Sequence, residues 1–181
     1  IKPLAWFANL YIWVFRGTPM MVQIMIAFAL MHISAPTIQI GILDVDLTRL
    51  IPGILIISMN SGAYVSETVR AGINAVPKGQ LEAAYSLGIR PKNAMRYVIL
   101  PQAFSVALPS ISANVIFLLK ETSIVSIVAL ADLVYVAKDL IGLYYKTDEA
   151  LFMLVISYLV IILPVSLALS YVEKRVRNAR S

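Results

Sequence analysis

Four consecutive polar residues interrupt a long apolar stretch of the sequence: Lys120, Glu121, Thr122 and Ser123. Ionisable side chains at membrane depth are costly, so they mark ligand or ion pathways where they occur. An ammonium beside a carboxylate offers a partner to each charge of a zwitterion, and a helix broken here would add free backbone groups. The alternative is that Lys120 extends to the outer interface. The sequence favours the ligand site, because the apolar run "SIVSIVALA" continues beyond it.

A second interruption is "RGTP" at 16–19. Gly17 and Thr18 precede a proline here, and such a break either frees backbone groups for a ligand or only kinks a packed helix. Asn114 lies seven residues before Glu121 and therefore on nearly the same helical face. We expect Asn114 either to contact a substrate or to hydrogen-bond a neighbouring helix.

The spacing of Glu67 and Arg70, at i and i+3, predicts an intrahelical ion pair, with gating as the alternative. A metal site is not expected, because the chain has no cysteine and a single histidine, His32. The sequence also lacks the glycine-rich loop that binds nucleotide phosphates. We therefore expect this chain to bind no cofactor.

The composition is that of a bilayer protein, with 60% hydrophobic and 14% charged residues. Roughly 20 apolar residues in a helix cross the hydrocarbon layer. The sequence predicts an all-α membrane protein, a polytopic helical bundle whose spans lie in the regions Leu4–Ile33, Leu47–Val65, Ala103–Ala131 and Ala150–Val172. The third region would be about 44 Å long as one helix, which is too long for an upright span.

The charges then segregate between the two sides of the membrane. Eleven of the 15 basic residues fall on one side, which the positive-inside rule makes cytoplasmic. These are Lys2, Arg16, Arg70, Lys78, Arg90, Lys92, Arg96, Lys174, Arg175, Arg177 and Arg180. The net charge of +5 thus follows the membrane and does not indicate a nucleic-acid partner.

The cytoplasmic loop between the second and third spans has its own architecture. Residues Lys78–Leu87 favour a helix, Gly88 stands where a left-handed cap ends it, and Pro91 begins a second helix. Small alanines on the surface of such a hairpin permit close approach by another protein. We expect another protein to bind this hairpin. We also expect the hairpin to act as a rigid lever and to end at Pro101.

This loop resembles the signature of bacterial ABC importer permeases, in which E-A-A, three residues, G, nine residues, I, one residue and L-P follow one another. The matching residues are Glu82, Ala83, Ala84, Gly88, Leu100 and Pro101, with Val98 in place of isoleucine. The stretches "FRGTP" at 15–19, "YVSETVRAGINAVPKGQ" at 64–80 and "LLKETSIVSIVALADL" at 118–133 are similar to the branch that imports polar amino acids.

The resemblance implies one transmembrane permease domain over 1–181 with the type I importer fold, in which 76–101 form the cytoplasmic coupling helices. It implies a multi-pass protein of the bacterial cytoplasmic membrane, surrounded by lipid and paired with itself or a similar subunit. Members of the branch usually have five spans, so the four predicted here imply a further N-terminal span outside this chain.

The implied partners are a cytoplasmic ATPase dimer, which binds ATP and Mg²⁺, and an extracytoplasmic amino-acid-binding protein. The permease itself is then not an enzyme. Two rival functions remain: a channel or structural subunit that does not use ATP, and an exporter. The sequence does not identify the amino acid.

Overall fold

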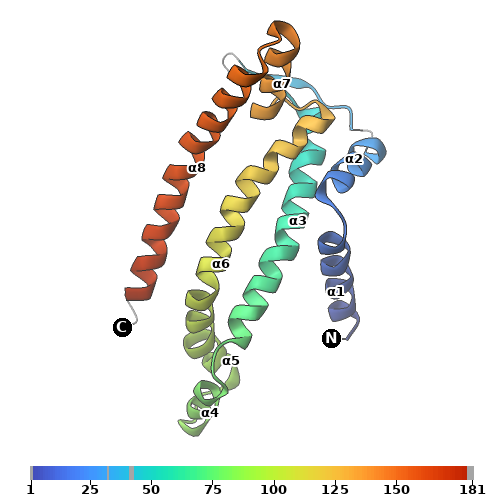
Figure 1. The fold of residues 1–181 in the computed structure, drawn as a ribbon. Coiled ribbons are helices and arrows are strands. Elements are labelled where there is room, and N and C mark those ends of the chain that lie inside the picture. Colours follow the sequence, from blue (N-terminus) through green and yellow to red (C-terminus); the bar gives the residue numbers. More distant parts are fainter. Residues whose placement is uncertain (1, 32, 41–42, 179–181) are drawn as a thin grey trace. The chain divides into compact units, whose positions relative to one another are not determined.

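The structure is a computed structural model that describes residues 2–31, 33–40 and 43–178 (Figure 1). It is 85% helical, which confirms the predicted fold class. His32 lies outside the described residues. The chain divides into a first unit, Ile1–Ala63 with Phe117–Leu163, and a second unit, Tyr64–Ile116 with Pro164–Ser181. Three helices contribute to both units: α3 (Leu47–Asn74), α6 (Leu100–Glu121) and α8 (Thr147–Asn178).

The first unit contains a sharp break between its first two helices and one 3₁₀ helix. Its further elements are α1 (Lys2–Gly17), α2 (Met20–Leu30), the strands β1 (Thr37–Ile40) and β2 (Leu43–Asp46), the 3₁₀ helix η2 (Thr122–Val128) and α7 (Leu133–Tyr144). The core consists of Ile24 from α2 and Val125 and Val128 from η2, and Ile24 has no exposed surface. Because α2 carries few polar side chains, this apolar contact fixes it against η2.

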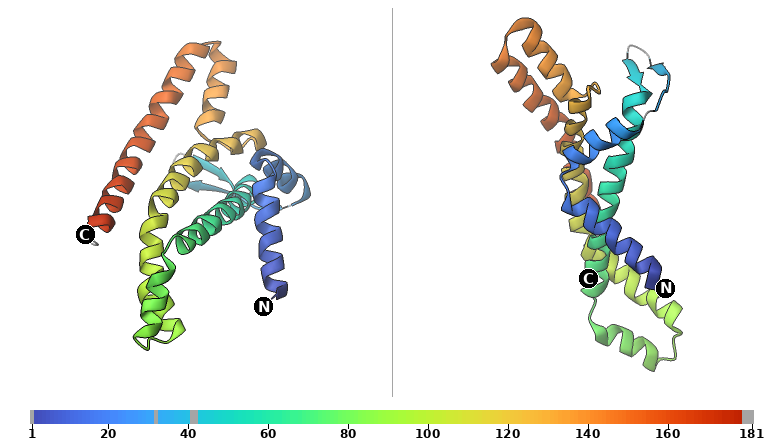
Figure 2. Two further views of the ribbon diagram at one scale, coloured as in Figure 1. Left: turned by 60° about the horizontal axis from the view of Figure 1, so that its bottom comes forward. Right: turned by 90° about the vertical axis from the view of Figure 1, so that its right-hand side faces the viewer.

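The two strands form an antiparallel hairpin that the sequence did not predict (Figure 2, right). Thr37 pairs with Asp46, and the hairpin leads directly into α3. Asp46 accepts a hydrogen bond from the backbone N–H of Thr48 at 2.9 Å, which caps the first turn of α3. Arg49 donates to the backbone carbonyl of Ala129 at 2.6 Å, so the start of α3 is tied to the end of η2.

The second unit contains the cytoplasmic hairpin predicted from the sequence. Its elements are α4 (Lys78–Ser86), α5 (Pro91–Ala94), the π-helix η1 (Met95–Ile99) and the adjoining parts of α3, α6 and α8. Val76, Ile99 and Ala103 form the core. Gly72 allows α3 and α6 to approach closely, since a Cβ there would lie 2.8 Å from the carbonyl oxygen of Ala103.

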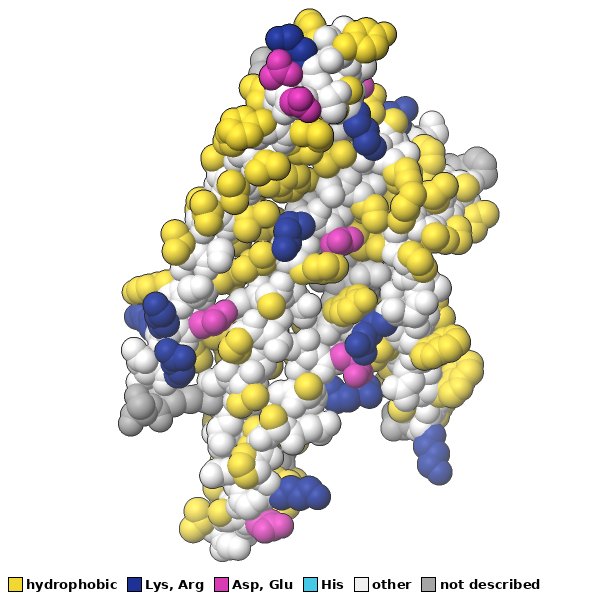
Figure 3. Space-filling model, viewed as in Figure 1, with side chains coloured by type: hydrophobic (Ala, Val, Ile, Leu, Met, Phe, Trp, Pro, Cys, Tyr) yellow, Lys and Arg dark blue, Asp and Glu magenta, His cyan; other side chains and the backbone are white. Residues whose placement is uncertain are grey.

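Two described helical segments are long and apolar enough to cross a membrane, Pro91–Val128 and Thr147–Asn178, and the bent pair α1–α2 would make a third. Figure 3 shows hydrophobic side chains along the visible face of α8. α3 is not among the helices that are apolar enough to cross a membrane, although the sequence predicted a span over Leu47–Val65. Charged side chains of α3, such as Arg49 and Glu67, lower its mean hydropathy. The predicted number of four spans is therefore approximate.

Candidate functional site

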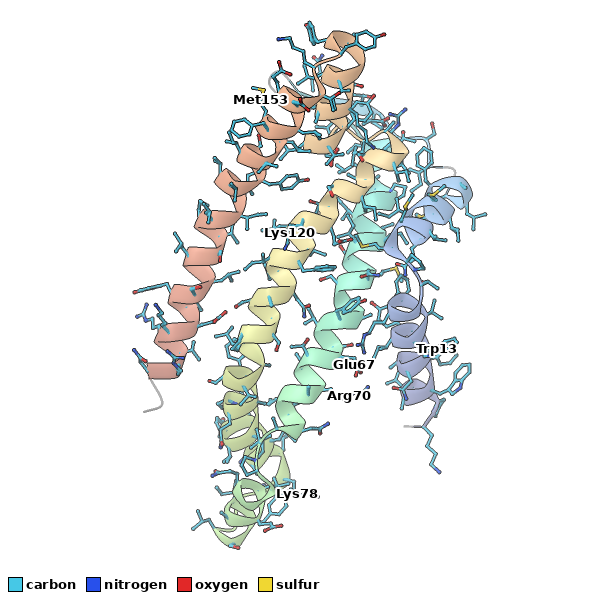
Figure 4. All side chains as sticks on the ribbon, viewed as in Figure 1. Trp13, Glu67, Arg70, Lys78, Lys120 and Met153 are labelled. Carbon is cyan, nitrogen blue, oxygen red and sulfur yellow. The ribbon has the colours of Figure 1, made fainter. Side chains whose placement is uncertain are left out.

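Lys120 and Glu121 lie where the helix changes type. α6 ends at Glu121, η2 begins at Thr122 as a 3₁₀ helix, and η2 ends before Ala129, whose φ of 56° is left-handed. The predicted interruption is thus a change of helical pitch within the segment Pro91–Val128. Lys120 is exposed and labelled in Figure 4. Within the described part of the chain, neither Lys120 nor Glu121 forms an ion pair.

The hydroxyl groups of Thr122 and Ser123 bond to the preceding turn. Thr122 Oγ1 donates to the carbonyl of Leu119 at 2.8 Å, and Ser123 Oγ donates to the carbonyl of Lys120 at 2.7 Å. These carbonyls belong to the last turn of α6, where α-helical partners run out. Each hydroxyl proton is therefore occupied locally, and the hydroxyl oxygens remain as acceptors.

The predicted break at Gly17 and Thr18 separates α1 from α2, and the two helices are bent by 107°. A Cβ on Gly17 would meet nothing within 4 Å, so the space beside Gly17 is open. Thr18 Oγ1 donates to the carbonyl of Val14 at 2.7 Å. The same oxygen accepts a hydrogen bond from Nε2 of Gln23 at 2.6 Å.

Two side-chain amides satisfy carbonyls that the break leaves free. Gln23 Nε2 donates to the carbonyls of Phe15 and Thr18, both at 3.0 Å. Asn60 of α3, which is 7% exposed, donates to Phe15 at 3.0 Å and to Oε1 of Gln23 at 3.1 Å. Sequence reasoning did not single out Gln23; its one signal was a lone amide among the apolar residues of 20–30.

The helical segments that follow the two interruptions pack against each other. Met20, at the start of α2, packs with Ile24 against Val125 and Val128 of η2. The helix that follows the "GTP" break thus lies on the helix that follows Glu121, within the first unit. α2 follows a helix break and η2 is a 3₁₀ helix, and membrane transporters use interrupted helices of this kind to present polar groups to a ligand.

The remaining predicted polar residues lie in the second unit. Asn114 Nδ2 donates to Oγ1 of Thr68 at 3.1 Å, so its hydrogen bond is the interhelical one. Glu67 and Arg70 form the predicted intrahelical pair at 3.4 Å, on one side of α3 (Figure 4). The structure therefore provides the packing alternative for each of these residues.

The turn between α4 and α5 is a Schellman motif, as the sequence predicted. Gly88 has a left-handed φ of 74°, and its N–H donates to the carbonyl of Tyr85 at 2.9 Å. The N–H of Ile89 donates to the carbonyl of Ala84 at 3.1 Å, which completes the motif. Pro91 occupies the first turn of α5, where its missing N–H costs nothing.

The surface of the hairpin differs from the prediction for one alanine. Glu82 and Ala83 are exposed, but Ala84 is 3% exposed because it faces the inside of the hairpin. Two large apolar side chains that the sequence did not single out are also exposed: Leu87, beside Gly88, is 80% exposed, and Tyr85 is 46% exposed. Large apolar side chains at the tip of a water-facing hairpin mark a contact surface for another protein.

The prediction that the hairpin ends at Pro101 is wrong. Leu100 and Pro101 lie in the first turn of α6, and the helix is continuous from Pro91 onward. The π-helix η1 directly precedes them. Its wider turn makes room for the proline ring and tolerates the hydrogen bond that proline, without an N–H, does not form. The second coupling helix and the following span are thus one helix.

Across 2–31, 33–40 and 43–178, the structure shows no group of three or more His, Asp or Glu side chains that could hold a metal ion. Of the residues predicted for the candidate site, Lys120 and Glu121 are the ones that carry a charge. The arrangement can bind a zwitterion by ion pairing and hydrogen bonding.

Comparison with known proteins shows the family of the chain. Residues 2–178 match the family described as "Binding-protein-dependent transport system inner membrane component". The chain is 35% identical to the arginine transport system permease protein ArtQ of Bacillus subtilis (strain 168), over 98% of this chain and 77% of ArtQ. It is also 35% identical to the putative glutamine transport system permease protein GlnP of Rickettsia felis (strain ATCC VR-1525 / URRWXCal2), over 96% of this chain and 76% of GlnP.

A solved structure has the same fold. The crystal structure of an amino acid ABC transporter with histidines superposes with a TM-score of 0.82 and 38% identity, over 97% of this chain and 78% of that chain. The family match covers nearly the whole chain and includes the hairpin and both helix interruptions. The chain belongs to the family of binding-protein-dependent transport system inner membrane components.

Proposed function

We propose that this chain is the permease subunit of an ATP-driven importer of polar amino acids, with Lys120 and Glu121 facing the translocation path. The observation that carries the proposal is the pair of charges without an ion-pair partner among the described residues, inside an apolar helical segment. Such charges are tolerated at membrane depth where they line a water-filled cavity. The named substrates of the relatives, arginine and glutamine, support a polar amino acid.

In this proposal Lys120 binds the carboxylate of the amino acid, and Glu121 binds its ammonium group. Adjacent residues of a helix point in different directions, so the two charged side chains do not pair with each other. Each can instead bind one end of the ligand. Thr122 and Ser123 contribute their hydroxyl oxygens as acceptors, and the break at Gly17 and Thr18 contributes the open space beside Gly17. We assign Asn114 to helix packing, since its side-chain amide donates a hydrogen bond to Thr68.

The coupling part of the proposal concerns the hairpin of α4 and α5. The family implies an ATPase and a substrate-binding protein as partners. We propose that Glu82, Ala83, Gly88 and the exposed Leu87 meet the ATPase, while Ala84 supports them from inside the hairpin. Leu100 and Pro101 carry its motion into α6.

The assembly part completes the proposal. ATP and Mg²⁺ bind to the ATPase, and this chain carries out no catalysis. A second copy or a similar permease completes the transmembrane pathway in a bacterial cytoplasmic membrane.

Uptake of labelled amino acid into proteoliposomes that contain the complete transporter tests the proposal. Lys120→Gln and Glu121→Gln should each raise the half-saturating substrate concentration at least about thirty-fold, because each leaves a ligand charge unpaired. Lys146→Gln is the matched control, since Lys146 is exposed and pairs with Glu149 in the first turn of α8. Unchanged uptake in both variants would contradict the assignment, and flux without ATP would favour the channel.

A further inference from the structure

A cavity in the second unit opens between the first turns of α6 and the last turns of α8. Its volume is about 320 Å³, and its lining is Ser105, Leu108, Pro109, Ser170, Glu173, Lys174 and Arg177. This volume is at the lower end of the range for small-ligand sites. Neither the proposed substrate path nor the hairpin uses these residues.

One end of the lining is apolar and the other is charged. Leu108 and Pro109 form the apolar part, and Lys174 and Arg177 lie at the end of α8, where basic and acidic side chains gather in Figure 3. Since the apolar run of α8 ends at Val172, the charged part falls at the cytoplasmic headgroup level of a bilayer. The gradient from apolar to basic follows that of a phospholipid from acyl chain to phosphate.

The polar groups of the lining are available to a ligand. In the part of the chain that the structure describes, Glu173, Lys174 and Arg177 form no ion pair. The Ser105 hydroxyl is buried at the wall and has no hydrogen-bond partner among the described residues. Two cations and one carboxylate give the lining a net positive charge, and the carboxylate adds an acceptor for headgroup donors.

We propose that this cavity binds the headgroup of a phospholipid from the cytoplasmic leaflet. Lys174 and Arg177 hold the phosphodiester, Glu173 accepts from headgroup hydroxyl or ammonium groups, and the acyl chains begin along Leu108 and Pro109. Basic pockets between transmembrane helices on the cytoplasmic side are suited to anionic headgroups. An anionic headgroup with hydroxyl donors, such as that of phosphatidylglycerol, fits this lining better than phosphatidylcholine, which is net neutral and has no donor.

Native mass spectrometry of the delipidated complete transporter, titrated with phosphatidylglycerol or phosphatidylcholine, tests the proposal. The wild type should bind phosphatidylglycerol preferentially, and the double variant Lys174→Gln/Arg177→Gln should lose about thirty-fold in affinity. Arg175→Gln is the matched control, because Arg175 lies on the same helix outside the lining. The mass of the intact complex reports assembly in the same spectra.

A second variant keeps the charges and fills the space. Ser105→Leu should displace phosphatidylglycerol as the double variant does, without changing the net charge. Equal lipid binding by wild type and both variants would overturn the proposal. Displacement of phosphatidylglycerol by millimolar inorganic phosphate would also overturn it, because a small anion would then be the ligand.

Discussion

The side-chain amide of Asn60 on α3 donates a hydrogen bond to the backbone carbonyl of Phe15, two residues before the end of α1, at 3.0 Å. The same amide bonds Gln23 on α2, so one buried residue joins three helices of the first unit. A carbonyl freed by a helix break in an apolar environment needs such a partner. Asn60 therefore stabilises the break.

Replacing Asn60 with leucine should destabilise the protein by about 1 to 3 kcal/mol, because it leaves the Gln23 oxygen without a donor and removes one of the two donors to the Phe15 carbonyl. The midpoint of thermal unfolding in detergent should fall by about 2 to 4 °C for each kcal/mol. Ser58→Ala, at an exposed position of the same helix, is the control. An equal midpoint for Asn60→Leu and Ser58→Ala would show that the amide network contributes nothing.

Gly88→Ala should weaken the hairpin, because its φ of 74° costs a residue with a Cβ about 1 to 2 kcal/mol. The N–H of Ile89, bonded to Ala84, should then exchange with solvent faster, and ATP-driven uptake should fall. Gly79→Ala offers a matched comparison within α4, where nothing lies within 4 Å and the φ is ordinary. Normal exchange at Ile89 in the Gly88 variant would contradict the strain argument.

Leu87→Ser tests whether the tip of the hairpin contacts the ATPase. Burial of a leucine side chain contributes about 1.5 to 3 kcal/mol, so affinity for the ATPase should fall about tenfold or more. Leu143→Ser is the control, since Leu143 is 72% exposed on α7, away from the hairpin sequence. Titration of the purified ATPase into both variants measures the effect, and equal affinities would place the contact elsewhere.

Burial raises the pKa of Asp132 above its ordinary value of 3.8, although its Oδ1 accepts a hydrogen bond from the N–H of Tyr135 at 2.7 Å. The folded protein then binds a proton more tightly than the unfolded chain. Stability from this group should therefore increase as the pH falls from the raised pKa to 3.8, and decrease as the pH rises through the same window.

The substitution Asp132→Asn should remove this pH dependence. At pH values above the raised pKa, the variant should have a higher melting temperature than the wild type, because asparagine caps α7 without a charge to desolvate. Asp139→Asn, exposed on the same helix, controls for the loss of one negative charge. The difference in melting temperature between wild type and Asp132→Asn, followed across pH, isolates this group. A constant difference would show that Asp132 does not titrate in the window.

Local features of the fold could be predicted from the sequence. Gly88 and Pro91 determine their turn through backbone conformations that glycine and proline alone favour, so neighbours in the chain suffice. The pair Glu67 and Arg70 is likewise set by helical spacing. These predictions required no knowledge of which helices touch.

Features that depend on distant contacts could not be predicted. Asn114 could contact a substrate or hydrogen-bond a neighbouring helix, and only the structure shows Thr68 beside it. Gln23 stands in an apolar helix, and its role depends on Phe15 and Asn60. Pro101 was misread because proline inside a helix usually interrupts it, and the π-helix that precedes Pro101 in this continuous helix has no sequence signature.

The π-helix has a consequence for where the hairpin faces. A π-turn holds about one residue more than an α-turn, so the five residues of η1 cover nearly the same angle around the axis as four residues of a regular helix. Deleting one residue between Met95 and Ile99 would therefore restore regular winding and leave the direction of the hairpin almost unchanged. Deleting one residue from the regular part of α6 that follows would instead turn the hairpin by about 100° relative to the rest of that helix.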